Sequence, residues 1–336
     1  MRVLRPVREG YGLMRPDDIH FEDRLSAVEE KIADLRRVVE QAGLDIDDAM
    51  SVVDEAYESA RAEAYQDLSP WQTVWMARHP QRPGGMEYVD ALLEDCVELR
   101  TDRIEGDDPA LASGLGWFEG EPVVYLAHRR GRSTRENLAL NFGMMHPAGY
   151  RKALHVMELA TKFGRPILSF IDTPAAHPGV HAETRGQAMA IAENLYHMAD
   201  MPVPIVVVVV GQGGSGGALG VGVGDVLLML QYAVYCVAPP EAFSGIIWKD
   251  AGEHAPEAAE GLKLTAEDLH RFDIVDEILQ EPVGGAHRDP AEVYGTVRTA
   301  IRRHLSRLQR LPAAELIQRR YEKYRTLGVF EEVTVA

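Results

Sequence analysis

The sequence has few cysteines and no long apolar run. Only Cys96 and Cys236 occur in 336 residues, far apart and without Cys-x-x-Cys spacing. This excludes a disulfide framework and a thiolate zinc site built from this chain alone, and we expect two reduced, buried thiols. The longest purely aliphatic run, residues 205–210, is far too short to span a bilayer.

Positive charge is also scarce. The chain has 35 Lys and Arg residues against 52 Asp and Glu residues, a net charge of −17, which argues against a nucleic-acid or anionic-membrane surface. The bases concentrate in residues 298–325, where nine stand against two acids. The N-terminus lacks the apolar region of a signal peptide, so we expect a cytoplasmic protein that is not secreted.

The first part of the chain is predicted to form a helical hairpin. Apolar residues recur at steps of three and four over 21–42, a second helical stretch covers about 46–65, and Gly43 ends the first helix. A turn-rich segment, Ala77–Gly85, then separates this arm from the rest.

The predicted organisation has three parts. They are an N-terminal helical arm over 1–76, a catalytic domain over 77–325 and a C-terminal tail over 326–336.

From about Val123 onward, short β-branched runs alternate with helical stretches. The candidate strands are Val123–Ala127, Ile167–Asp172, Ile205–Val210, Val234–Val237 and Ile274–Ile278. The candidate helices are Gly149–Phe163, Ala182–Asp200, Gly216–Gly224 and Pro290–Leu308. This alternation predicts an α/β fold with buried parallel strands. It does not distinguish a doubly wound sheet from a spiral of ββα units.

The most informative segment is a glycine-rich turn that follows a buried strand. Residues 211–217 hold five glycines and lead into a helix. Glycine allows a close approach of backbone or ligand. The N–H groups at the start of the helix lack intrahelical partners and favour an anion or oxyanion.

Several interpretations of this turn remain open. Gly211-x-Gly213-x-x-Gly216 fits a dinucleotide fingerprint, but the nearby acid Asp225 is too close. Gly213-Gly-Ser215-Gly-Gly217 fits the elbow of a serine hydrolase, with Asp276 and His287 as candidate partners of Ser215. A Walker phosphate loop fails because Gly217 replaces its lysine. A further alternative is that the turn only packs a helix against a strand in a non-catalytic scaffold.

Three longer stretches resemble the carboxyltransferase alpha subunit of bacterial acetyl-coenzyme A carboxylase. They are Asn141–Ala153, Phe170–Gln187 with its Asp-Thr-Pro and Pro-Gly-Val motifs, and Gly211–Asp225. Ala77–Pro83, Gly131–Asn137 and Pro282–Arg288 extend the resemblance, which covers roughly residues 20–325. Their common order along the chain makes the resemblance specific.

The resemblance implies a crotonase-like spiral of ββα units and an α2β2 heterotetramer with a beta subunit. It implies transfer of a carboxyl group from carboxybiotin, held on a biotin carboxyl carrier protein, to acetyl-CoA, giving malonyl-CoA for fatty-acid synthesis. Biotin carboxylase belongs to the wider complex. Zinc is expected on the beta subunit, and no metal in this chain.

The resemblance also implies the site residues. Backbone N–H groups at Gly216, Gly217 and Ala218 would stabilise the oxyanion, so that no side-chain base is required. The expected biotin-binding residues are Gly213, Gly214, Ser215, Pro174, His177, Pro178 and Gly179. Three residues depart from the family pattern: Ala175 replaces Gly, His177 replaces Tyr and Gln212 replaces Glu.

Other polar residues have plainer interpretations. Asp172 at a strand end is expected to position the following loop through backbone bonds. The basic cluster His128–Arg132 is interpreted first as solvated loop charge, and otherwise as a contact to a partner or to CoA phosphates. His177 and His181 are separated by Pro178 and Gly179, and His128, His146, His254 and His287 stand singly, so no metal site is predicted.

Overall fold

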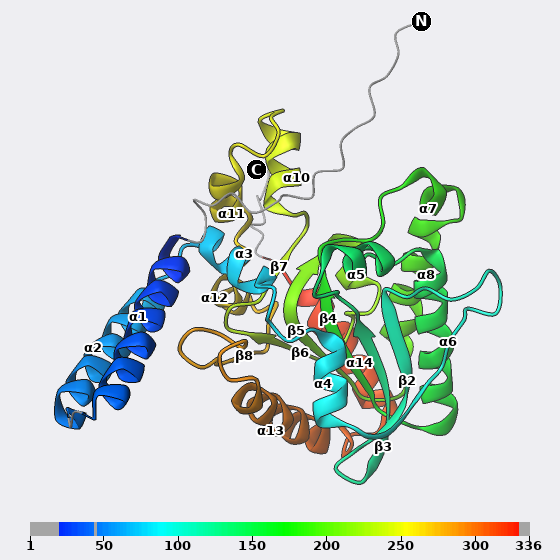
Figure 1. Ribbon diagram of the computed structural model, residues 1–336. Coiled ribbons are helices and arrows are strands. Elements are labelled where there is room, and N and C mark those ends of the chain that lie inside the picture. The colour runs from blue at the N-terminus through cyan, green and yellow to red at the C-terminus, as the bar shows by residue number, and fades with distance from the viewer. Residues whose placement is uncertain (1–19, 44–45, 329–336) are drawn as a thin grey trace, which may run out of the picture. The chain divides into compact units, whose positions relative to one another are not determined.

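The computed structural model describes residues 20–43 and 46–328, in two compact units that meet between Leu68 and Ser69. The first unit is a helix pair, α1 (His20–Ala42) and α2 (Asp47–Gln66) (Figure 1). The hydroxyl of Tyr65 donates a 2.7 Å hydrogen bond to the buried Glu22 carboxylate. Both helices lie where the apolar spacing predicts them, and Gly43 follows α1 with φ = +62°.

The second unit begins eight residues before the predicted boundary at 76/77. Its first helix, α3 (Pro70–Arg78), starts with a reciprocal capping box between Ser69 and Gln72. The predicted boundary loop therefore lies inside this unit, between α3 and α4 (Gly85–Leu92). Of the predicted tail, residues 329–336 lie outside the described residues.

One sheet organises the second unit. Its described part has eight strands in the order β1-β2-β3-β4-β5-β6-β8, with β7 paired to β5. The pairs β1–β2 and β2–β3 are antiparallel, and all later pairs are parallel. The strands are β1 (Glu94–Glu98), β2 (Leu111–Phe118), β3 (Glu121–His128), β4 (Ile167–Thr173), β5 (Ile205–Gly214), β6 (Val226–Leu230), β7 (Val234–Cys236) and β8 (Glu277–Leu279).

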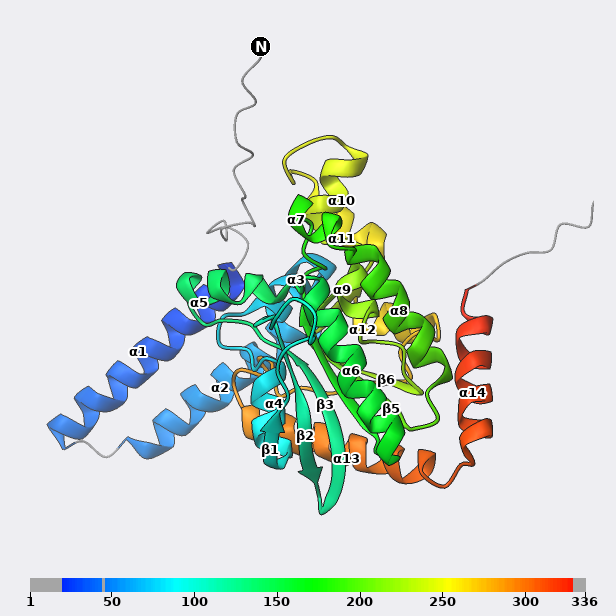
Figure 2. The ribbon, with the colours of Figure 1, turned by 90° about the vertical axis from the view of Figure 1, so that its right-hand side faces the viewer.

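Helices cover both faces of this sheet (Figures 1 and 2). On one face lie α4 and α13 (Pro290–Leu308), where Tyr88 of α4 stacks on Phe170 of β4. On the other lie α6 (Pro147–Phe163) and α8 (Gln187–Asp200). The other helical segments are α5 (Thr134–Ala139), the 3₁₀ turn η2 (Asn141–Gly143), α7 (Val180–Thr184), α9 (Ser215–Leu219), α10 (Pro240–Ile247), α11 (Ala255–Leu262), α12 (Ala266–Arg271) and α14 (Ala313–Thr326).

The observed elements match the predicted alternation, with several differences. Strands β1, β2 and β6 are not among the predicted strands, and β8 begins only at Glu277. The helix predicted over 182–200 breaks into α7 and α8 at Gly186, whose φ is +83°. The helix predicted over 216–224 ends at Leu219, because closely spaced glycines turn the chain into β6.

The basic segment 298–325 is partly neutralised within the chain. Four of its bases pair with acids outside the segment: Arg302 with Glu119, Arg303 with Glu277, Arg320 with Asp225 and Lys323 with Asp276. Arg320 is fully buried and also donates to backbone carbonyls in the last turn of α8 and just after it, which fixes α14 to the domain. Among the helices in the described ranges, none has the length and apolar character needed to cross a membrane.

Candidate active site

The glycine-rich turn lies at the carboxyl end of the longest strand. The apolar part of β5 is fully buried, the strand ends at Gly214, and α9 begins at Ser215. Gly216 and Gly217 occupy the second and third helical positions, whose N–H groups have no acceptor inside a helix. These groups can stabilise negative charge on a bound molecule.

The loop that follows β4 packs directly on this turn. Thr173 at the end of β4 is in register with Gly213 of β5. A methyl group at Gly217 would lie 2.7 Å from the carbonyl oxygen of Ala175, and one at Gly214 would overlap the carbonyl of Pro174. The structure therefore brings the predicted segments 174–179 and 213–218 together, and only glycine permits this approach.

Residues outside the predicted set hold this loop in place. The hydroxyl of Thr173 donates to the Ala175 carbonyl at 2.8 Å. The buried amide of Gln187 donates to the carbonyls of Met145 and His177, and the His177 N–H donates to Met145. Met145 lies in the stretch Asn141–Ala153 and Gln187 ends the stretch Phe170–Gln187. Both stretches resemble the family, and this resemblance is the sequence feature that could have indicated these two residues.

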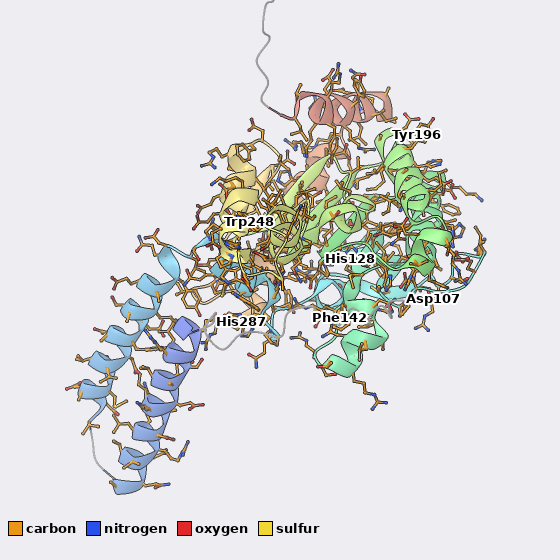
Figure 3. The ribbon with its side chains drawn as sticks, turned by 90° about the horizontal axis from the view of Figure 1, so that it is seen from above. Asp107, His128, Phe142, Tyr196, Trp248 and His287 are labelled. Atoms are coloured by element: carbon orange, nitrogen blue, oxygen red, sulfur yellow. The ribbon has the colours of Figure 1, made fainter. Side chains whose placement is uncertain are left out.

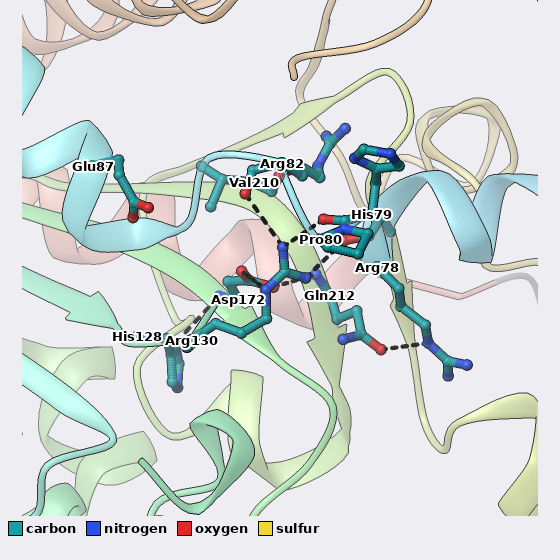
Figure 4. A network of polar contacts seen from close by, with 12 residues as sticks. Arg78, His79, Pro80, Arg82, Glu87, His128, Arg130, Asp172, Val210 and Gln212 are labelled. Carbon is teal, nitrogen blue, oxygen red and sulfur yellow. Dashed lines mark hydrogen bonds and ion pairs between the residues drawn. The ribbon is translucent and has the colours of Figure 1, made fainter. Parts of the chain in front are cut away.

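A network of polar side chains surrounds the end of β5, where the turn begins (Figure 4). Asp172 is shielded from solvent and accepts the Gln212 N–H at 3.0 Å, while its other oxygen lies 3.5 Å from Arg130 Nε. The amide oxygen of Gln212 accepts from Arg78 Nε at 2.8 Å, and Arg78 also pairs with Glu241. Asp172 thus binds backbone, but it holds Gln212 near the end of β5 and not, as predicted, the loop that follows β4.

A second buried pair fixes the strand just before the turn. Both guanidinium NH2 groups of Arg82 bind Glu281, at 2.8 and 2.6 Å, and neither side chain is exposed to solvent. The Nε of Arg82 donates to the carbonyl of Val210 at 2.8 Å. Arg82 belongs to the Ala77–Pro83 motif, but sequence reasoning does not identify Glu281 as its partner.

The basic cluster His128–Arg132 is paired within the chain, and only Arg132 at its end is exposed, so its first interpretation as solvated loop charge holds for that residue alone. His128 is fully buried in the second unit (Figure 3), which lowers its pKa to about 4. Arg129 pairs with Glu98. Arg130 donates to three carbonyls of the Ala77–Arg82 segment, and Arg132 pairs with Glu87. These bases hold loops of the chain together.

Two histidines predicted to stand singly, His146 and His287, are stacked on another histidine. The rings of His146 and His177 have centroids 4.0 Å apart, and those of His79 and His287 are 3.7 Å apart. Burial and nearby arginines lower the pKa of His79 to about 4, and burial with His79 lowers that of His287 to about 3. Within the described ranges no group of three His, Cys, Asp or Glu side chains suits a metal ion.

The geometry does not assemble the serine hydrolase site. Ser215 has φ = +51°, as a nucleophile elbow requires. However, Asp276 exchanges hydrogen bonds with Leu227, which is in register with Val207 at the opposite end of the strands. Eight residues of β5 place that carboxylate roughly 25 Å from Ser215. The dinucleotide interpretation likewise lacks its acid, because Asp225 is paired with Arg320.

If the reaction is the carboxyl transfer that the sequence resemblance implies, we expect Ser215→Ala to lower its rate by less than about threefold. In that reaction the hydroxyl is not a nucleophile, while the N–H groups that follow it keep their positions. The assay is the rate of malonyl-CoA formation by the variant together with the beta subunit that the same resemblance implies. A loss of several hundredfold would restore Ser215 as a reacting group.

Comparisons with known proteins agree on one family. The family described as "Acetyl co-enzyme A carboxylase carboxyltransferase-like" matches residues 18–328. Acetyl-coenzyme A carboxylase carboxyl transferase subunit alpha of Nostoc punctiforme is 48% identical over 319 residues, covering 95% of this chain and 98% of its own. The protein of the same name from Heliobacterium modesticaldum is 48% identical over 311 residues, covering 93% and 92%.

Solved structures with low sequence identity share the fold. A Pseudomonas malonate decarboxylase hetero-tetramer in complex with coenzyme A has a chain that matches with a TM-score of 0.57 at 19% identity, over 72% of this chain and 95% of its own. Transcarboxylase 12S matches with a TM-score of 0.53 at 18% identity, over 68% of this chain but only 44% of its own. Together with the family match, these likenesses confirm the predicted crotonase-like α/β fold.

Proposed function

This chain belongs to the family of acetyl-coenzyme A carboxylase carboxyltransferase alpha subunits, and from that premise we propose that it forms the carboxybiotin half of a shared active site. The reaction is carboxyl transfer to acetyl-CoA, giving malonyl-CoA. The observation that carries the proposal is the contact between the glycine turn and the loop after β4. In this contact the loop backbone lies directly against Gly214 and Gly217, with no side chain between them.

The residues at the turn fit the biotin group of the carrier protein. Carboxybiotin supplies the carboxyl group, and its ureido oxygen gains negative charge as that group leaves. In the proposed site the N–H groups of Gly216 and Gly217 donate to this oxygen. The N–H of Ala218 is at the fourth helical position, where Gly214 is the regular acceptor, and the Ala218 side chain is fully buried. We therefore assign Ala218 to packing behind the donors.

The other predicted biotin-binding residues form the edge of this site. Gly213 and Gly214 line a small pocket with Pro174, beside Gln212 and Arg78. Pro178 is exposed, and Gly179 is partly exposed. We propose that these residues face the biotin rings, whereas Ser215 only supplies the positive φ that starts α9.

The proposed partner is a beta subunit that carries the acetyl-CoA side of the site and a zinc ion. The relatives of this chain are named subunit alpha, which supports a second kind of subunit in the enzyme. The proposed assembly is an α2β2 heterotetramer that receives carboxybiotin from the carrier protein, with biotin carboxylase as a separate component.

Activity is expected only when this chain is mixed with its beta subunit. The measurement is malonyl-CoA-dependent carboxylation of free biotin by the chain alone, by the beta subunit alone and by the mixture, with the mass of the complex determined in parallel. Transfer by the chain alone would show that it holds both halves. A stable complex without transfer would contradict the proposed function.

A further inference from the structure

Two imidazole rings meet in the loop whose first residues pack on the glycine turn. His146 lies at the N-cap of α6, and His177 lies in the loop after β4. Their rings stack with centroids 4.0 Å apart and 24° between the planes, while His181 meets the His146 ring edge-on at 5.9 Å.

The His177 ring is fixed in the loop through one of its nitrogens. The N–H of Gly179 donates to Nδ1 of His177 at 3.1 Å. This contact fixes the orientation of the ring relative to the loop backbone. In His146, Nδ1 is buried and has no hydrogen-bond partner among the described residues, so an added proton there would find no acceptor. The His146 ring therefore favours the neutral form.

The loop that carries His177 is the one that touches the glycine turn. Its residues Pro174–Ala176 are so close to Gly214 and Gly217 that a methyl group at either glycine would overlap the loop backbone. The loop is tied down again at His177, through its N–H to the Met145 carbonyl at 3.0 Å. A displacement at His177 would therefore reach the turn through three residues of packed backbone.

We propose that His177 is a positioning residue for carboxyl transfer, whose ring packs on His146 and holds Pro174–Ala176 against the glycine turn. The inference rests on the proposed function, because it assigns the turn to the reaction. Without the ring, the loop would lose both its stacking contact with His146 and the bond from the Gly179 N–H.

The charged groups around His146 do not disturb the ring on which His177 packs. They are Glu105, Asp107 and Asp108 from the loop before β2, and His181 and Arg185 from α7 and its end. One oxygen of Asp108 is occupied by the backbone N–H of His146 at 2.6 Å. Burial first, and then His177, His181 and Arg185, lower the pKa of His146 below its ordinary value. The ring that supports His177 is therefore neutral near pH 7.

The experiment compares kcat and KM for carboxyl transfer by the complex with a beta subunit. His177→Ala is expected to lower kcat about tenfold, because the loop and the turn can separate, and to leave the KM for acetyl-CoA unchanged. His177→Tyr and His177→Phe keep a ring on His146, and their kcat is expected to stay within about threefold of wild type.

His181→Gln is the matched control, because His181 lies in the same segment but is exposed. It is expected to keep the wild-type kcat. A wild-type kcat in His177→Ala would overturn the inference while transfer itself stands. NMR titration of labelled histidines in the chain alone decides the point without catalysis. The pKa of His146 should rise in His177→Tyr, and an unchanged value would overturn the inference.

Discussion

Gly217→Ala is expected to lower kcat for carboxyl transfer by about 10²–10³-fold, the loss seen when an oxyanion-hole donor is removed. The added methyl would overlap the backbone of Ala175 and lie 2.7 Å from both its carbonyl oxygen and the N of Ala176. Backbone cannot yield as a flexible side chain does, so the turn and the loop must separate. A displacement of about 1 Å is enough to cost a hundredfold in rate.

Two other glycines provide the controls for this variant. At Gly216 an added methyl meets only the side chain of Ile191, with Cδ1 at 3.2 Å, and that side chain can move. The kcat of Gly216→Ala is therefore expected to stay within about tenfold of the wild-type value, since its N–H remains. Gly295 in α13 has nothing within 4 Å of an added methyl, and Gly295→Ala should keep the wild-type kcat. Thermal unfolding of each variant separates lost activity from lost fold. Wild-type activity in Gly217→Ala would contradict the assignment of the turn.

The sequence predicts best those elements whose signals are local. The helix over Pro290–Leu308 has the predicted bounds, because Asp289 caps its first turn by accepting the Glu292 N–H and the apolar spacing continues to Leu308. The glycine turn is equally local, since a buried strand, five glycines and a helix follow one another directly. Such features need no knowledge of the rest of the fold.

The missed strands depend on contacts that the local pattern does not show. β2 contains Gly114 and Gly116, which weaken a strand prediction. Gly114 is required because a methyl there would lie 2.8 Å from the Tyr125 hydroxyl and overlap the Val97 carbonyl of β1. β1 itself is mostly exposed and lacks an apolar face. Tertiary pairing, rather than local propensity, makes these two segments strands.

The contacts that hold the candidate site together are likewise not visible in the local sequence pattern. The resemblance and the glycines indicate the turn and the loop, which do meet in space. The bonds that hold them join residues far apart in sequence, such as Asp172 with Gln212 and Arg78 with Glu241. No spacing rule connects such pairs. The stacking of His146 on His177 is hidden for the same reason.

Arg82→Met is expected to destabilise the domain by about 3–5 kcal/mol, the usual result of removing one partner from a buried ion pair. Glu281 would keep the N–H groups of Tyr232 and Ala286 as donors but would lose its countercharge in a site without solvent. The carbonyl of Val210, just before the glycine turn, would also lose its donor. Urea unfolding should show the loss, and carboxyl transfer should fall with it.

Two further variants identify the buried charge as the cause. Arg132→Met breaks an ion pair with Glu87 whose side chains are 46% and 36% exposed, and it should cost less than about 1 kcal/mol. The double variant Arg82→Met with Glu281→Gln removes the isolated charge but keeps an amide oxygen that can accept a backbone N–H. It should therefore be more stable than Arg82→Met alone, a non-additive result that a loss of packing would not give. Equal stability of the single and double variants would instead mean that the bond from Arg82 to Val210 carries the effect. The anchoring of β5 would then matter more for the turn than the ion pair does.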